Sequence, residues 1–287
     1  MPEIKPLSAN PLAKHFRQPK LYIQLPSKGK YYSEADLEVT ETGEYPVYPM
    51  TARDEIAFKT PDALLNGQST VDVIQSCMPN IKNAWAIPSI DIDTILIAIR
   101  IASYGESMDV TARIPNINES REYSINLREV VDEINGVEFE DTVVFQDMLI
   151  HLRPLNYKEW TKSAISTFEE QRIFALVNNE KISEEEKLKI FNTSFRKLTE
   201  ITVGVIIASI TAIEVDEQTV SDKLHIQQFV ENADREFYDV INKHIETQKI
   251  KFGTKPRTVI TSEEDREKGA PESFEMPLTF DQSHFFG

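Results

Sequence analysis

Residues 89–104, with the sequence SIDIDTILIAIRIASY, form the most apolar helical pattern of the chain. The isoleucines and the leucine of this stretch cover most of the circumference of a helix, which is typical of a helix buried on all sides. Ser89 or Asp91 can cap its first turn, and Gly105 can end it. We therefore predict a core helix over residues 90–104.

Short elements precede this core helix. Aromatic and β-branched residues flank Gly and Pro between residues 21 and 50, and this pattern predicts a small hairpin. Three short helices are expected next: one capped by Thr51, one over residues 60–67 and one over residues 69–78. The N-terminal part is thus predicted to be mostly helical with a small β element.

After the core helix the apolar residues follow a period of two. Residues 108–114 and 121–127 alternate like two strands around Pro115-Asn116-Ile117-Asn118, which predicts a hairpin. Residues 143–152 are predicted to form a third strand. This central segment is therefore expected to be rich in β structure.

Beyond Pro154 the apolar residues return to helical spacing. One face of a first helix carries Tyr157, Trp160, Ala164 and Phe168, and one face of the next carries Leu188, Phe191, Phe195, Leu198 and Val205. A further single helix is predicted from about Asp222 to Gln248. After Gly253 the periodicity fades, and we expect a mostly extended tail.

These patterns predict an α+β fold that is predominantly helical. The expected organisation has five segments along the chain. They are an extended basic arm (1–20), an N-terminal mostly helical unit with a β-hairpin (21–107), a β-rich central segment (108–155), a helical unit (156–252) and an extended C-terminal tail (253–287).

The charge is unevenly distributed. The chain has a formal net charge of −16, yet the segment from Met1 to Ser33 carries +5, so the remainder carries −21. An acidic chain repels phosphate backbones, so nucleic acid is not expected as a partner. The five prolines of the basic segment forbid a continuous helix there. We predict an extended arm that uses Lys14, Arg17 and Lys20 to bind a partner; the alternative is a disordered terminus.

The sequence carries no recognisable set of catalytic or metal-ligating residues. The five histidines fall outside any zinc-binding motif, and no nucleophile elbow or phosphate-binding loop is present. Pro26-Ser-Lys-Gly-Lys lacks the glycines of such a loop and is predicted to be a turn. Asp91 and Asp93 are explained by their place at a helix start, and Cys77 by packing. We expect a protein that is not an enzyme and has neither cofactor nor metal.

No stretch of the sequence suggests export or membrane insertion. The chain starts without the apolar run of a signal peptide, and its most apolar stretches are too short to cross a bilayer. A single cysteine also excludes a disulfide within the chain. We expect a protein that stays in the cytosol where it is made.

Several blocks of sequence resemble the baseplate hub subunit family of contractile-tailed, T-even-like bacteriophages. They are Leu25-Pro-Ser-Lys-Gly-Lys-Tyr-Tyr32, residues 44–56, residues 59–67, residues 95–105 and the closing Pro277-Leu-Thr-Phe-Asp-Gln-Ser-His-Phe-Phe286. The resemblance is strong from about Leu25 to Met108, weak in the middle helices, and returns at the tail.

This resemblance implies a structural or assembly role in the baseplate hub of a phage tail. The implied partners are other hub and tail proteins, the tape measure protein among them, and further copies of the chain. The implied location is the tail baseplate of the virion, after assembly in the host cytoplasm. The aromatic end of the tail, with Phe280, Phe285 and Phe286, can anchor in a partner's groove or fold back on its own chain.

The chain departs from the family pattern at one point. Members of that family often carry a C-P-x-C pair near the start of the central hairpin and a second pair nearer the C-terminus. Here the first place reads Ile114-Pro115-Asn116-Ile117, and residues 261–275 contain no cysteine. The family's zinc site is therefore not expected, and apolar packing of Ile114 and Ile117 can hold the hairpin instead.

Two other functions compete with a permanent hub subunit. One is a transient assembly chaperone that shields tape measure helices and is absent from the mature virion. The other is a cell-wall hydrolase, which requires a catalytic constellation that the sequence lacks.

Overall fold

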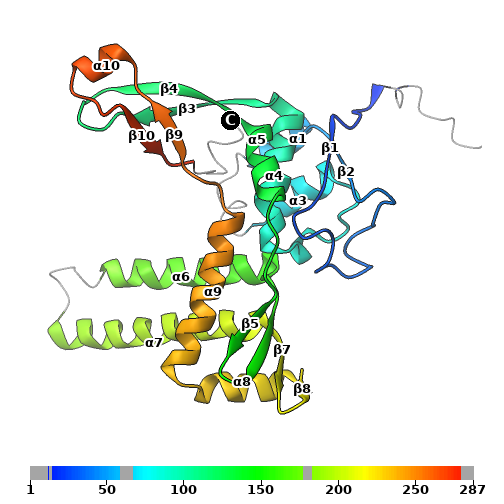
Figure 1. Cartoon of the computed structure of the whole chain (residues 1–287), viewed down its shortest axis with the longest axis vertical. Coiled ribbons are helices and arrows are strands. Elements are labelled where there is room, and N and C mark those ends of the chain that lie inside the picture. The colour runs from blue at the N-terminus through cyan, green and yellow to red at the C-terminus, as the bar shows by residue number, and fades with distance from the viewer. Residues whose placement is uncertain (1–11, 13–14, 59–66, 177–182, 279–287) are drawn as a thin grey trace, which may run out of the picture.

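The computed structural model describes residues 12, 15–58, 67–176 and 183–278. Figure 1 shows an elongated molecule with helices α1, α3, α4 and α5 at one end, a sheet with α8 at the other, and α9 running between them. The α+β class predicted from the sequence is confirmed. The predicted helix over residues 60–67 begins in a segment that lies outside the described residues.

The first end of the molecule is built around α4. Its elements are β1 (Leu21–Ile23), β2 (Tyr45–Val47), α1 (Ala52–Phe58), α3 (Gln68–Cys77), the 3-10 helix η2 (Ala84–Ala86), α4 (Ser89–Tyr104) and α5 (Leu127–Asn135). Ile95, Ile97 and Ile99 of α4 are fully buried, so the core helix is confirmed. We call the hydrophobic cluster around it the α4 core. Strands β1 and β2 pair antiparallel as the predicted hairpin.

Two long hairpins extend sideways from this end (Figure 1). The first, predicted from the sequence, consists of β3 (Ser107–Arg113) and β4 (Ser120–Asn126), paired antiparallel with Val110 opposite Tyr123. The second consists of β9 (Arg257–Ile260), α10 (Glu263–Glu267) and β10 (Ser273–Met276). The prediction of a mostly extended tail after Gly253 was therefore wrong for this part. Ser262 caps α10 by accepting from the Asp265 N–H, a local signal that the sequence analysis did not use.

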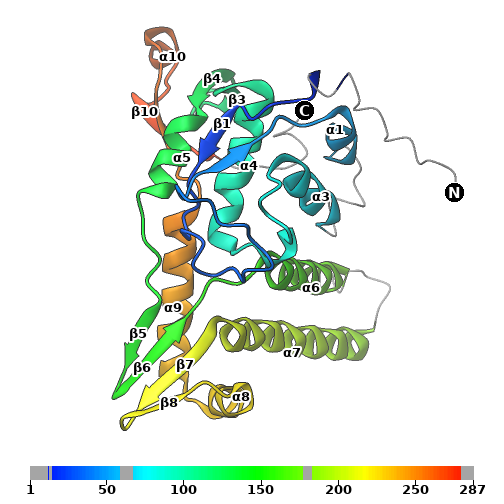
Figure 2. The ribbon, with the colours of Figure 1, turned by 90° about the vertical axis from the view of Figure 1, so that its right-hand side faces the viewer.

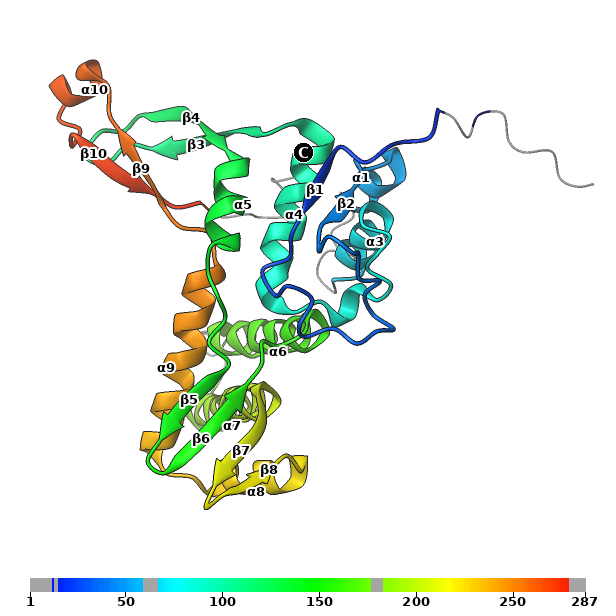
Figure 3. The same cartoon turned by 45° about the vertical axis from the view of Figure 1, so that its right-hand side comes forward.

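The opposite end contains a four-stranded antiparallel sheet in the order β5-β6-β7-β8. Its strands are β5 (Thr142–Phe145), β6 (Met148–Leu152), β7 (Ile210–Val215) and β8 (Gln218–Val220). The single strand predicted over residues 143–152 was wrong, because the chain reverses at Gln146, whose φ of 53° is left-handed. Figure 3 shows this sheet beside the lower end of α9.

Helices α8 (Lys223–Asn232) and α9 (Arg235–Phe252) replace the single helix predicted over residues 222–248. The helix breaks at Ala233 and Asp234, and the Asp234 side chain accepts from the Phe237 N–H at 2.9 Å. An aspartate that satisfies the first free amides of a helix favours a new helix start over continuation. Phe237 and Ile241 then pack on the sheet with Phe145 and Ile150, and we call this cluster the sheet core.

Helix α9 belongs to both cores. Its first half contributes Phe237 and Ile241 to the sheet core, whereas Phe252 at its end is buried in the α4 core. The segment that connects α5 to β5 is also fixed to α9, because the Gln248 side chain of α9 accepts from the Glu140 N–H at 3.1 Å. The two cores are therefore joined by a continuous helix as well as by the connecting chain.

Helices α6 (Tyr157–Leu176) and α7 (Glu184–Ser209) form an antiparallel pair. Figure 2 shows the pair side by side, with α7 extending well beyond the sheet. Ser183 and Glu186 form a reciprocal capping box at the start of α7. The pair is the most prominent projection of the described chain besides the two hairpins.

Candidate functional site

The basic arm is attached to the body by Arg17. Its guanidinium donates to the Pro49 carbonyl at 2.6 Å and to the Ser76 carbonyl and hydroxyl at 2.5 and 2.8 Å. It also lies 3.3 Å from the Asp54 carboxylate, which is nearly buried. Arg17 therefore fixes the end of the arm onto α1 and α3, and its donors are engaged within the chain rather than offered to a partner.

The other predicted contact residues are placed differently. Lys20 is exposed, and its backbone N–H donates to the Val47 carbonyl at 2.9 Å, so the arm extends β1. Lys14 and the three tail residues Phe280, Phe285 and Phe286 lie outside the described residues. The structure thus brings Arg17 and Lys20 to one end of the molecule.

Asp91 anchors the loop that carries the sequence block from Leu25 to Tyr32. Its carboxylate accepts from the Ser27 N–H at 2.7 Å, from the Ser27 hydroxyl at 2.5 Å and from the Tyr32 hydroxyl at 3.0 Å. The predicted role of Asp91 or Ser89 as a helix cap was wrong, since Pro88 occupies the cap position and Asp91 turns toward the loop. Complete burial raises the pKa of Asp91 to about 6, against the lowering effect of these hydrogen bonds.

The loop itself is a turn, as predicted. Lys28 and Gly29 have left-handed φ values of 53° and 79°, and the Lys28 N–H donates to the Leu25 carbonyl at 2.8 Å. The Lys28 ammonium pairs with Glu138 on the segment that connects the two cores. This block of sequence therefore has a structural use, which is to hold the loop against α4 and the connecting segment.

The turn between β3 and β4 is held by burial, hydrogen bonds and ion pairs. Ile114 is buried and its N–H donates to the Glu119 carbonyl at 3.0 Å, which closes the β3–β4 hairpin. The Arg121 guanidinium reaches Asp265 of the second hairpin at 2.8 Å, and the Lys268 ammonium reaches Glu119 at 3.0 Å. These ion pairs lower the pKa of Asp265, after the larger effect of the Ser262 hydroxyl. Charge pairs thus connect the β3–β4 hairpin to the β9–β10 hairpin.

The titratable residues of the described chain do not assemble into a chemical centre. Within residues 12, 15–58, 67–176 and 183–278, no group of three or more His, Cys, Asp or Glu side chains could hold a metal. His151 lies 2.8 Å from Glu214 on the sheet, and His244 contacts the Glu140 carbonyl at 2.8 Å on α9. Each pairing ties neighbouring elements together.

Cys77 is fully buried beneath the arm. Burial, reinforced by Asp54, raises the pKa of its thiol to about 12, although Arg17 acts in the opposite direction. The usual value is 9.0. Since only the thiolate is nucleophilic, we expect a thiol-specific disulfide reagent to modify the native protein at least about a thousandfold more slowly than the denatured protein at neutral pH. Colorimetric labelling measures both rates, and comparable rates would show that Cys77 is accessible.

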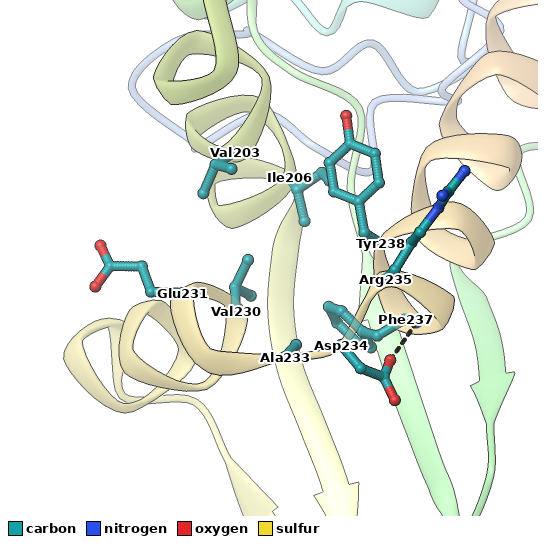
Figure 4. A pocket seen from close by; sticks show the side chains of 9 residues that line it. All are labelled: Val203, Ile206, Val230, Glu231, Ala233, Asp234, Arg235, Phe237 and Tyr238. Carbon is teal, nitrogen blue, oxygen red and sulfur yellow. Dashed lines mark hydrogen bonds between the residues drawn. The ribbon is translucent and has the colours of Figure 1, made fainter. Parts of the chain in front are cut away.

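A pocket lies where α7, α8 and α9 meet, and it has a cavity volume of about 410 Å³. Figure 4 shows apolar side chains such as Val203, Ile206 and Val230 on its walls. Its polar residues serve local structure, because Asp234 caps α9 and Arg235 pairs with Asp239 at 3.4 Å. The pocket therefore combines apolar walls with polar residues, of which Asp234 and Arg235 are engaged within the chain.

The pair of helices α6 and α7 exposes part of the apolar faces that the sequence predicted for them. On α6, Trp160 and Phe168 are 46% and 60% exposed; on α7, Leu188 and Phe195 are 62% and 61% exposed. The contact between the two helices is polar. Ser194 of α7 is buried there, and the Lys197 ammonium of α7 pairs with the buried Glu170 carboxylate of α6 at 2.8 Å. Exposed apolar surface of this extent marks a place for contact with another protein.

The fold consists of two joined cores, from which two hairpins and a helix pair with an exposed apolar face project. A family model described as T4 bacteriophage base plate protein matches residues 20–258, and the chain belongs to this family. It is thus a structural component of a phage tail baseplate that contacts other tail and baseplate proteins, and this membership favours a non-enzymatic role.

Two further comparisons found no relatives. No curated protein and no solved structure matches the chain. None of the described helices combines the length and the apolarity that a membrane span requires.

Proposed function

We propose that the protein is a subunit of the baseplate hub and acts through protein contacts alone, without catalysis. The observation that supports this best is the exposed apolar face of the α6–α7 pair, which projects from the body and is of no evident use to the isolated chain. The sequence blocks between Leu25 and Met108 favour the hub over other parts of the baseplate. The proposed partners are other hub and tail proteins, the tape measure protein among them.

The two ends of the chain are proposed as additional contact regions. Lys14 and Lys20 would bind acidic surfaces of neighbouring subunits, while Arg17 holds the arm on its own body. Phe280, Phe285 and Phe286 would insert into apolar sites of a neighbour. The five-segment organisation stays a proposal; the sheet core joins residues on both sides of the expected border at 155.

A transient assembly chaperone is the second candidate, because an exposed apolar face also suits a protein that shields helices before assembly. Quantitative mass spectrometry of purified virions separates the two. A hub subunit is expected at a constant, integral number of copies per particle. Its absence from virions, together with its presence in infected host cytoplasm, would favour the chaperone.

The same measurement tests the two ends. A chain lacking residues 1–16 keeps Arg17, and its incorporation into virions is expected to fall if the arm binds a neighbour. Replacing Phe285 and Phe286 with alanine is expected to lower incorporation without changing the thermal stability of the isolated protein. A loss of stability instead would mean that these rings pack on their own chain.

A further inference from the structure

We infer that the α6–α7 face binds an amphipathic helix whose apolar stripe is flanked by acidic residues. The inference deepens the proposed function and rests on it. It identifies the chemistry of the partner from the geometry of the face and from the charges along its edges.

The apolar residues of each helix form a single stripe. Leu188, Phe191 and Phe195 on α7 are spaced by three and four residues, so they lie on one side of that helix. Phe191 and Phe195 stack with ring centroids 6.4 Å apart. On α6, Trp160 and Phe168 are two helical turns apart on one side.

Both stripes lie on the same side of the helix pair. The contact between the helices is marked by Glu170 on α6 and by Ser194 and Lys197 on α7. Counting from this contact at 100° per residue, each stripe lies about a third of a turn further in the same rotational sense. In an antiparallel pair the same sense brings both stripes to one side of the layer. The result is an apolar strip along two adjacent helices, a shape that accepts a third helix.

The strip begins in the body of the protein. Trp85 stacks on Tyr157 with centroids 5.6 Å apart, and Tyr157 stacks on Trp160 at 6.0 Å. Trp85 and Tyr157 belong to the α4 core or pack against it. The exposed strip is therefore supported by rigid aromatic packing at one end, which favours binding because little order has to be gained.

Two arginines border the strip, although the chain as a whole is acidic. Arg172 borders it on α6 and Arg196 on α7, and both are exposed. Within the described part of the chain neither forms an ion pair. Two acidic residues lie near the same edge of α7: Glu185 is three turns from Arg196 at the tip, and Glu200 is one turn from it in the other direction. A partner helix with Glu or Asp beside its apolar stripe would meet these arginines.

The same charges disfavour a second copy of this chain as the occupant. Packing one α6–α7 face on another would bring Arg172 and Arg196 of both copies to a common rim. Like charges at the edge of an interface oppose association. The partner is thus inferred to be a different chain.

Synthetic helical peptides about three heptads long test the inference. Both carry leucine at the a and d positions; one has glutamate and the other lysine at the e and g positions. Binding to the full chain is followed by the anisotropy of labelled peptide and by the fluorescence of Trp160, which lies in the strip. We expect the glutamate peptide to bind about tenfold more tightly than the lysine peptide at low salt.

Charge reversal provides the sharpest variant. Arg172→Glu with Arg196→Glu is expected to invert the preference between the two peptides. Lys158→Glu with Lys162→Glu makes the same change in charge on the other side of α6, away from the strip, and is expected to keep the wild-type preference. Circular dichroism verifies that both variants are folded.

Three results would overturn the inference. They are the absence of binding by either peptide, an equal response of the two charge-reversed variants, and a dimer of the free chain that Phe195→Ser dissociates. The last result, measured by sedimentation, would identify a second copy as the occupant. The virion measurement tests the role in the particle, whereas the peptides test the chemistry of the partner, so the two proposals can fail separately.

Discussion

Replacing Asp91 with alanine is expected to lower the free energy of unfolding by about 2–4 kcal/mol. The carboxylate is fully buried and is the common acceptor for the Ser27 N–H, the Ser27 hydroxyl and the Tyr32 hydroxyl. Its removal leaves a buried backbone donor without an acceptor and frees the loop from α4. Urea denaturation of the variant and the wild type measures the difference. A change within about 0.5 kcal/mol, as at an ordinary surface position, would contradict this role.

The pH dependence provides a second measurement at the same residue. The pKa of Asp91 rises from 3.8 to about 6 on folding. Between these values the folded chain retains a proton that the unfolded chain has lost, so this group's contribution to stability falls as the pH rises from about 4 to about 6. The full change is on the order of 3 kcal/mol, since each pKa unit corresponds to about 1.4 kcal/mol.

Asp91→Asn isolates this contribution from the other carboxylates. Asparagine cannot ionise, so the advantage of the wild type over the variant is expected to shrink as the pH rises through this window. Denaturation curves at a series of pH values follow the difference. An advantage that stays constant with pH would mean that Asp91 titrates normally in the folded protein.

Replacing Phe237 with alanine is expected to destabilise the sheet core by about 3–5 kcal/mol. The ring is 1% exposed and lies edge-on to Phe145 and Phe229, with centroids 5.4 and 5.0 Å away. Its deletion removes both aromatic contacts and leaves a cavity between the sheet, α8 and α9.

Hydrogen exchange shows where the destabilisation acts. In Phe237→Ala, the amides of β6 are expected to lose protection before those of α4, because the two clusters are separate. Ile97→Ala, a large-to-small change in the α4 core, is the matched control and should have the reverse order. Equal loss of protection at both places in both variants would indicate a single cooperative unit.

The sequence predicted those elements whose signals are local. The circumferential isoleucines of α4 indicate burial without knowledge of its neighbours. Asn116 sits at the β3–β4 turn with a φ of 67°, a conformation that asparagine tolerates, so the hairpin could be predicted from its turn. Thr51 caps α1 as expected, since the Asp54 N–H donates to its hydroxyl at 3.3 Å.

The predictions were wrong where the local sequence is compatible with two different structures. The run from Val143 to Leu152 is mostly apolar, and its reversal at Gln146-Asp147 lacks the glycine that usually marks a tight turn. The apolar spacing across Ala233-Asp234 continues smoothly, so the break into α8 and α9 depended on a single capping aspartate. Asp91 followed a capping pattern, yet tertiary contact with Ser27 and Tyr32 determined its orientation.

The exposed apolar face of α6 and α7 could not be predicted from local sequence patterns, and the reason is different. The sequence identified the apolar stripes of α6 and α7 but could not tell which stripes the folded chain covers. That depends on the distance of Phe195 from any other element, which only the arrangement of the helices determines. Arg17 illustrates the converse, because a cation expected to bind a partner is held by its own chain through Pro49 and Ser76.

Helix α9 has a consequence for how this protein can evolve. Ile241 in the sheet core and Phe252 in the α4 core are separated along one uninterrupted helix by about 16 Å, at 1.5 Å per residue. Inserting a single residue between them would lengthen this separation by only about 1.5 Å but would rotate one core against the other by about 100°. Insertions or deletions in α9 are therefore compatible with both cores only in steps close to a whole turn. The helix thus determines both the distance between the α4 core and the sheet core and their relative rotation.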